Sequence, residues 1–160
     1  MGKRILLIDG DQTMSEAINT TLGSAGHRVQ VETSGADALE VFSPDPYAFD
    51  LIVMDMGLPD ISGLLLAEKL LKLRAHIPIV LLAGPEGQAQ AKTRDSGIRW
   101  FSIKPVSMTD LIETAEKALA GVERSGLLRP CFGISTVIPL LGNPLSGLLE
   151  QLNCVVRLIG

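Results

Sequence analysis

The chain has little of what a thiol-metal site, a disulfide framework or a nucleic-acid interface requires. Among its 160 residues are two cysteines, Cys131 and Cys154, and two histidines, and none of these follows a metal-ligand spacing such as CxxC. We therefore expect no zinc site and a reducing, cytoplasmic environment. Acidic residues outnumber basic residues by 18 to 14, and the net charge of −4 argues against direct binding of nucleic acid.

Uninterrupted apolar segments are also scarce. The longest uncharged run, Pro130 to Leu149, has the 20-residue length of a membrane span, but three prolines and three glycines interrupt it. The apolar run that ends before Asp9 is too short for a signal peptide. We expect no membrane segment. Apolar residues still make up 46% of the chain, which is enough for a folded core.

Short apolar runs alternate with helical patterns from residue 3 to about residue 121. Three runs are typical of strands buried on both faces: Ile5–Ile8, Asp50–Asp55 and Ile79–Leu82. Two further strands are predicted at Arg28–Glu32 and Trp100–Ile103, and helices over residues 13–25, 35–42, 63–74, 86–95 and 109–120. Because parallel strands need crossover connections, this alternation predicts an α/β fold with a doubly wound, five-stranded parallel sheet, either flavodoxin-like or Rossmann-like.

Residues 122–160 have a different composition, so we divide the chain into a domain at 1–121 and a C-terminal apolar extension at 122–160. Within the extension the pattern indicates strands at 134–141 and 154–159 around a helix at 145–152. Its role is open. The extension could pack on the first domain, it could dock or form a homodimer through leucines at helical spacing, or it could begin a truncated output domain.

Charged residues follow several of the predicted strands at the edge where an open parallel sheet binds ligands. Asp9 and Asp11 follow the first strand, Asp55 ends the third, and Lys104 follows the fifth. Neighbouring carboxylates repel each other, and Mg²⁺ relieves that repulsion because it prefers carboxylate oxygens. With a lysine beside them, these residues suit a phosphoryl group held on or near Asp55. For Asp11, capping of the next helix is the structural alternative.

Several catalytic and nucleotide-binding motifs are missing. No GxGxxG or GxxxxGK[ST] loop follows the first strand, and the chain has neither a GxSxG elbow nor a Ser-His-Asp set. These absences argue against a dinucleotide site, a nucleoside triphosphate site and a hydrolase. His27 and His76 lie in loops at the opposite ends of the strands, where we expect solvent-exposed side chains without a catalytic role.

Residues 3–121 resemble the receiver domain of two-component response regulators. The strongest piece runs from Asp55 through Pro59 to Gly63, with the family's spacing of phosphoacceptor aspartate, proline and glycine. Three more pieces agree with the family: the Lys104-Pro105 pair, the acidic opening at Ile5–Asp11, and Phe101 in the place of the switch aromatic. The resemblance implies a flavodoxin-like (βα)5 fold.

The resemblance also implies a function in two-component phosphorelay signalling. Asp55 would accept a phosphoryl group from a histidine kinase or a histidine phosphotransfer protein, with Lys104 contacting the phosphate. The cofactor would be Mg²⁺, held by Asp55, an acidic residue of the first loop and the carbonyl of Gly57. Such a domain is no enzyme beyond self-catalysed phosphoryl transfer and autodephosphorylation.

Three departures from the family pattern leave alternatives open. Gly10 stands where the second, metal-ligating acid is expected; Asp9 remains, and Asp11 could substitute through a shifted loop or a water. Ala83 stands where the family has a switch Ser or Thr, so the hydroxyl is absent, and the segment from Ala83 to Gly97 is one residue short. We therefore expect a phosphorylatable receiver, with a pseudo-receiver that binds partners independently of phosphorylation as the alternative. A small flavodoxin-like enzyme or cofactor binder is a third possibility.

Overall fold

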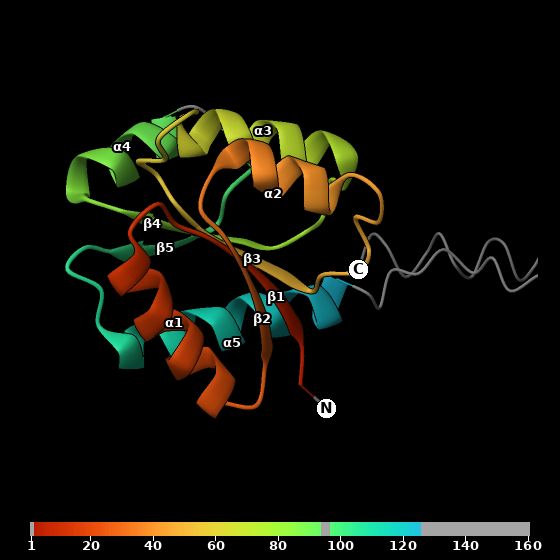
Figure 1. Cartoon of the computed structure of the whole chain (residues 1–160), viewed down its shortest axis with the longest axis vertical. Coiled ribbons are helices and arrows are strands. Elements are labelled where there is room, and N and C mark those ends of the chain that lie inside the picture. Colours follow the sequence, from red (N-terminus) through yellow and green to blue (C-terminus); the bar gives the residue numbers. More distant parts are fainter. Residues whose placement is uncertain (1, 94–96, 126–160) are drawn as a thin grey trace, which may run out of the picture. The chain divides into compact units, whose positions relative to one another are not determined.

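The computed structural model describes residues 2–93 and 97–125, which form a five-stranded parallel sheet with helices on both faces (Figure 1). The strands are β1 (Arg4–Ile8), β2 (Arg28–Glu32), β3 (Leu51–Asp55), β4 (Ile79–Ala83) and β5 (Trp100–Ile103). The helices are α1 (Gln12–Ser24), α2 (Gly35–Phe42), α3 (Gly63–Leu73), α4 (Pro85–Thr93) and α5 (Met108–Ser125). The strand order β2-β1-β3-β4-β5 confirms the predicted flavodoxin-like fold.

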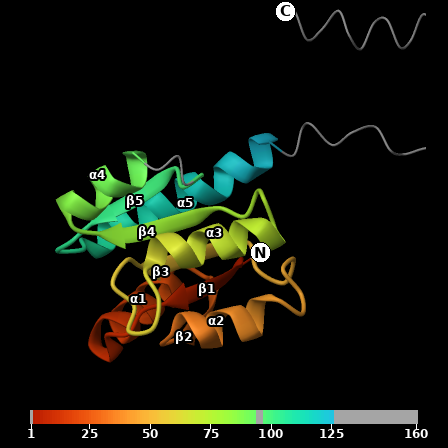
Figure 2. The same ribbon diagram turned by 90° about the horizontal axis from the view of Figure 1, so that it is seen from above.

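The helices form two layers, with α1 and α5 on one face of the sheet and α2, α3 and α4 on the other (Figures 1 and 2). Strand β1 shows how its sequence serves both layers. Leu6 and Ile8 join the core beneath α2 and α3, while Ile5 and Leu7 join the core beneath α1 and α5. A strand with this environment needs apolar residues at every position, which explains the continuous run read from the sequence.

Most predicted elements differ from the structure by one or two residues at their ends, and α5 differs most. The amphipathic pattern predicts a helix over residues 109–120, but the helix continues past Gly121 to Ser125. A glycine ends a helix where it adopts positive φ, and among the described residues only Gly26 and Gly97 do so. A Cβ at position 121 would lie 3.0 Å from Trp100 Cζ2, so Gly121 instead allows close packing of α5 against β5.

Several predictions concern residues outside the described part of the chain. Among these are the two cysteines, the strands and helix expected within residues 126–160, and the homodimer through the extension. The division at residue 121 also stays a prediction, and α5 crosses it. Among the helices of residues 2–93 and 97–125, none is long and apolar enough to cross a membrane.

Candidate functional site

The charged residues predicted from the strand ends gather at the carboxyl edge of the sheet. The register pairs Ile8 of β1 with Met54 of β3, so the next residues along the two strands, Asp9 and Asp55, are neighbours. Asp55 is 8% exposed, and its Oδ1 lies 2.8 Å from Lys104 Nζ. Strand β5 brings Lys104 to this edge, where its backbone N–H donates to the carbonyl of Ala83 at 3.0 Å. The structure therefore joins Asp55 and Lys104 in an ion pair.

Asp9 is the most deeply buried acid of this edge, with 1% of its surface exposed. Its Oδ1 accepts a hydrogen bond of 2.9 Å from the backbone N–H of Asp11, whereas its buried Oδ2 has no hydrogen-bond partner among the described residues. Burial raises the pKa of the Asp9 carboxyl, and the charge of Asp55 adds to that rise. The Asp11 N–H and Lys104 act in the opposite direction on the same pKa. Residues 2–93 and 97–125 thus supply no hydrogen-bond partner for one buried carboxylate oxygen.

Asp11 occupies the N-cap of α1, as the structural alternative proposed. Its Oδ1 accepts hydrogen bonds from the backbone N–H groups of Thr13 at 2.9 Å and Met14 at 3.2 Å. Within residues 2–93 and 97–125, no three His, Cys, Asp or Glu side chains are arranged to hold a metal ion. The predicted set of Asp9, Asp11 and Asp55 therefore does not form a three-carboxylate cluster. A role of Asp11 as a metal ligand, through a shifted loop or a water, stays a prediction.

Gly57 lies beside the phosphoacceptor position, because a Cβ on Gly57 would sit 3.5 Å from Asp55 Oδ2. The segment of residues 56–62, which we call the β3–α3 loop, is closed at its base. Gly57 forms an isolated β-bridge with Ser62, and the N–H of Gly63 donates to the carbonyl of Met56 at 2.9 Å. The loop that follows Asp55 therefore has a defined shape next to the carboxylates.

Gly10 has a packing role that the sequence does not reveal. A Cβ at this position would lie 3.3 Å from Pro59 Cδ and 3.6 Å from the carbonyl oxygen of Thr33. At position 10, where the family pattern has an acidic residue, the loops after β1, β2 and β3 thus approach each other closely. A larger side chain at position 10 would be directed toward Pro59.

The predicted switch positions lie on β4 and β5. Ala83 ends β4 and is buried, and Phe101 is half-buried and packs against the same core cluster. Helix α4 approaches this region at Gly87, where a Cβ would overlap the sulfur of Met56 and lie 3.1 Å from the Ala83 Cβ. Where the family pattern has a hydroxyl, this chain therefore has a methyl group packed among apolar atoms.

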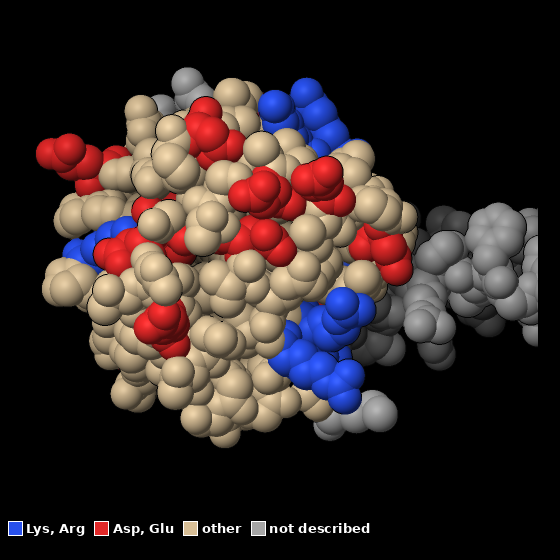
Figure 3. Space-filling model, in the orientation of Figure 1, with Lys and Arg blue, Asp and Glu red and all other residues tan. Residues whose placement is uncertain are grey.

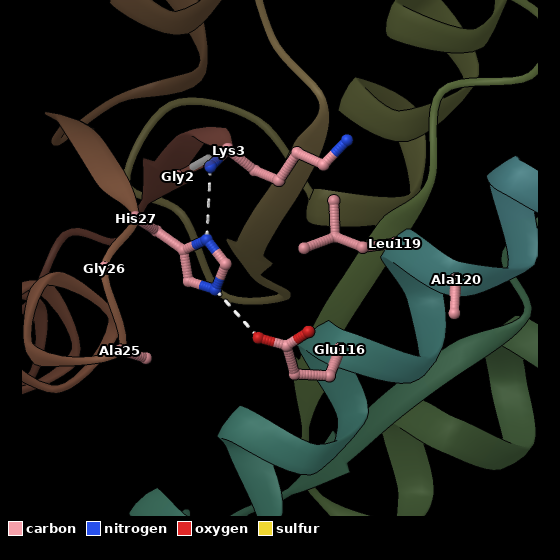
Figure 4. Close-up of a pocket in the computed structure, with 8 residues that line it drawn as sticks. All are labelled: Gly2, Lys3, Ala25, Gly26, His27, Glu116, Leu119 and Ala120. Carbon is pink, nitrogen blue, oxygen red and sulfur yellow. Dashed lines mark hydrogen bonds and ion pairs between the residues drawn. The ribbon is translucent and has the colours of Figure 1, made fainter.

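The sequence prediction for His27 is wrong, because its side chain is only 8% exposed. The loop before β2 turns inward after Gly26, which has a φ of 92°. The ring then links three elements at the amino edge of the sheet (Figure 4): Nδ1 accepts from the backbone N–H of Lys3 at 3.4 Å, and Nε2 lies 3.0 Å from Glu116 Oε1. These residues line a cavity of about 410 Å³. His76 is exposed, as expected.

The face of the molecule shown in Figure 3 carries many acidic side chains, which gather over α2 and the neighbouring loops. Helix α2 itself contributes Asp37 and Glu40, both exposed. Asp60 of the β3–α3 loop is also exposed, and its carboxylate hydrogen-bonds the backbone of α2. The sequence pattern alone does not distinguish Asp60 as a functional residue. Its position directly after Pro59 in the phosphoacceptor motif is the available signal.

The described geometry agrees with comparisons to known proteins. The family model of the response regulator receiver domain matches residues 5–116. The C4-dicarboxylate transport transcriptional regulatory protein DctD of Rhizobium meliloti is 30% identical over 143 residues, covering 86% of this chain and 31% of that protein. The cell cycle transcriptional regulator CtrA of Caulobacter vibrioides is 30% identical over 110 residues, covering 68% of this chain and 47% of that protein. This chain thus spans less than half of either relative.

Solved structures show the same fold. A CheY-like response regulator receiver domain protein from Methanospirillum hungatei has a TM-score of 0.71 at 27% identity, covering 79% of this chain and 100% of that one. The non-phosphorylated receiver domain of HemR from Leptospira biflexa has a TM-score of 0.67 at 28% identity, covering 74% of this chain and 94% of that one. Sequence motif, fold and the Asp55–Lys104 pair all lead to the same conclusion: the chain belongs to the response regulator receiver domain family.

Proposed function

We propose that this chain is a phosphoaccepting receiver in a two-component phosphorelay, with Asp55 as the phosphoacceptor. The observation that supports this most is the 2.8 Å contact between Asp55 Oδ1 and Lys104 Nζ at the carboxyl edge of a receiver fold. The donor is a histidine kinase or a histidine phosphotransfer protein, since the phosphoryl donors of this family carry it on histidine.

The transfer is a single displacement at phosphorus. A carboxylate oxygen of Asp55 forms the new P–O bond while the P–N bond to the donor histidine breaks, and the imidazole nitrogen keeps that electron pair. The ammonium of Lys104 is positioned to offset the charge that develops on the phosphoryl oxygens. Because Asp55 is 8% exposed, few waters surround this charge, and the contribution of Lys104 is larger than it would be on an open surface.

The residues at this edge fit a magnesium ion. Asp9 and Asp55 would hold it together with the carbonyl of Gly57, and the buried, unpartnered Oδ2 of Asp9 supports this assignment. Mg²⁺ commonly keeps several waters and binds through one or two carboxylates, so two acidic side chains are sufficient. When bound, the ion supplies positive charge that offsets the repulsion between the carboxylates and the phosphoryl group.

The pseudo-receiver alternative makes the opposite prediction about Asp55. Gly10 and Ala83 motivate it, because each removes a group that the family uses at this edge. In that case partners bind equally well whether or not Asp55 can be modified. The self-catalysed phosphoryl transfer and autodephosphorylation that the resemblance implies would then be absent. The expectation that this chain does not bind nucleic acid directly stays a prediction.

The test is Mg²⁺-dependent binding of beryllofluoride, followed by amide chemical shifts of the full chain. We expect shifts around Asp55, Gly57 and Lys104 in the wild type and none in Asp55→Asn. Asp45→Asn is the matched control, because Asp45 is an exposed acid whose Oδ1 accepts from the backbone N–H of Tyr47. Binding that persists in Asp55→Asn, or no binding by the wild type at millimolar Mg²⁺, would refute the proposal.

A further inference from the structure

We propose that Asp60 is a positioning residue that fastens the β3–α3 loop to the first turn of α2 and thereby sets the place of Gly57 beside Asp55. The inference rests on the proposed function, because Gly57 matters only if its carbonyl holds the metal ion. It also implies that occupancy of the site at Asp55 alters the first turn of α2.

Asp60 binds α2 with both oxygens of its carboxylate. Oδ1 accepts from the backbone N–H of Gly35 at 2.9 Å, and Oδ2 accepts from the N–H of Ala36 at 2.8 Å. These N–H groups belong to the first turn of the helix, where no intrahelical carbonyl is available to them. Hydrogen bonds to an ionised acceptor are stronger than neutral ones. Consistently, the Gly35 hydrogen bond, followed by that of Ala36, lowers the pKa of Asp60.

Close packing beside these hydrogen bonds requires a glycine on the helix side. A Cβ on Gly35 would overlap Cγ2 of Ile61 and lie 3.3 Å from Leu66 Cδ2. Gly35 is buried, and Ile61 packs against the core beneath α2 and α3. The loop therefore meets α2 through one bidentate carboxylate and one apolar contact, from residues adjacent in sequence.

The other side of the loop is held as well. Pro59 lies close to Gly10 in the loop after β1, and the bridge between Gly57 and Ser62 closes the base. Gly57 thus sits between the end of β3, which is fixed by the sheet, and Asp60, which is fixed by α2. If the Gly57 carbonyl moves, the Asp60 carboxylate moves with the loop, and its hydrogen bonds to the N–H groups of α2 change.

This connection matters more here because Ala83 lacks the hydroxyl that the family places at the end of β4. A change at α2 that is transmitted through Asp60 does not require a hydroxyl at position 83. We therefore expect occupancy at Asp55 to change the amide environment of Gly35 and Ala36, which lie in a different chain segment from the site.

The experiment measures two quantities in the full chain: the Mg²⁺ dissociation constant, from the Gly57 amide shift, and the shifts of the Gly35 and Ala36 amides on adding beryllofluoride. Asp60→Ala should weaken Mg²⁺ binding about 10-fold, as loss of a group that orients a metal ligand typically does. Asp60→Asn, which keeps one acceptor oxygen, should fall between Asp60→Ala and the wild type. If Asp60→Ala does not fold, Asp60→Asn alone carries the test.

Asp37→Asn is the matched control, because Asp37 lies in the same first turn of α2 and hydrogen-bonds the Ser34 hydroxyl at 2.6 Å. It should bind Mg²⁺ within about twofold of the wild type, all variants being compared at a temperature where they are folded. Unchanged Mg²⁺ binding in both Asp60 variants would overturn this inference and leave the proposed function intact. A wild type that binds no beryllofluoride would refute both.

Discussion

Replacing Asp9 with asparagine should stabilise the metal-free protein while weakening its magnesium site. Asp9 is 1% exposed, and its buried Oδ2 atom has no hydrogen-bond partner in the part of the chain that the structure describes. Asp9 also lies next to a second carboxylate, Asp55. Leaving a buried acceptor unpaired costs about 1–3 kcal/mol, and more when the group is charged. An asparagine is neutral, and its side-chain oxygen still accepts the hydrogen bond that Asp9 Oδ1 receives from the N–H of Asp11.

We therefore expect Asp9→Asn to raise the free energy of unfolding by about 1–3 kcal/mol in the absence of Mg²⁺. For a domain of this size each kcal/mol corresponds to roughly 3–6 °C in Tm. The assay is urea and thermal unfolding with EDTA and again with 10 mM Mg²⁺, taken as a roughly saturating concentration for a weak two-carboxylate site. Added Mg²⁺ should stabilise the wild type by linkage and should stabilise the variant much less.

Two results would refute this reasoning about Asp9. One is a variant less stable than the wild type without metal, which would mean that the carboxylate is not an unpaired charge. The other is an equal stabilisation of both proteins by Mg²⁺, which would mean that Asp9 is not a ligand. The Asp110→Asn variant controls for the loss of one negative charge at an exposed position.

Three further predictions concern packing and pH. Gly63→Ala should destabilise the fold by about 1–3 kcal/mol, because the new Cβ would lie 2.6 Å from the Asp55 carbonyl oxygen. Gly23→Ala should instead stabilise α1 by about 0.5–1 kcal/mol, because nothing lies within 4 Å of its Cβ. Urea unfolding measures both changes. Leu70→Ala should cost about 2–5 kcal/mol in the same assay, because Leu70 is fully buried between α3 and the sheet, and a cost under 1 kcal/mol would contradict that burial. The lowered pKa of Asp60 means that the folded state holds this carboxylate ionised at a pH where the unfolded state, near its ordinary value of 3.8, takes up a proton. The contribution of the ionised Asp60 carboxylate to the free energy of unfolding is therefore complete above the unfolded pKa of 3.8 and is lost as the pH falls through the folded pKa. The urea midpoint of Asp60→Asn should thus depend less on pH below about 4 than that of the wild type.

The sequence was sufficient for the fold because the three central strands, β1, β3 and β4, are buried on both faces. Runs such as Leu51–Asp55 and Ile79–Ala83 are apolar at nearly every position, and the charged residues stand where these runs stop. The ion pair of Asp55 and Lys104 follows from that placement, since parallel strands end at one edge.

The features that the sequence did not predict depend on pairs of residues far apart in the chain. The burial of His27 involves Lys3, which directly precedes the first strand, and Glu116 of the last helix. The role of Asp60 requires a glycine 25 residues before it, and local patterns contain no information on such a pairing. Gly121 illustrates the same limit, because its small size serves a contact with Trp100 that periodicity cannot show.

Helix α5 runs from the carboxyl edge of the sheet to its amino edge. It begins just after Lys104 and Ser107, close to the edge that holds Asp55, and by Glu116 it has reached the opposite edge, where it contacts His27. A strand of five residues separates the two edges, a distance of about 16 Å. Ser125, the last residue of this helix, therefore lies toward the opposite edge of the sheet from Asp55. A change at Asp55 would reach that end of α5 through the packed core of the domain.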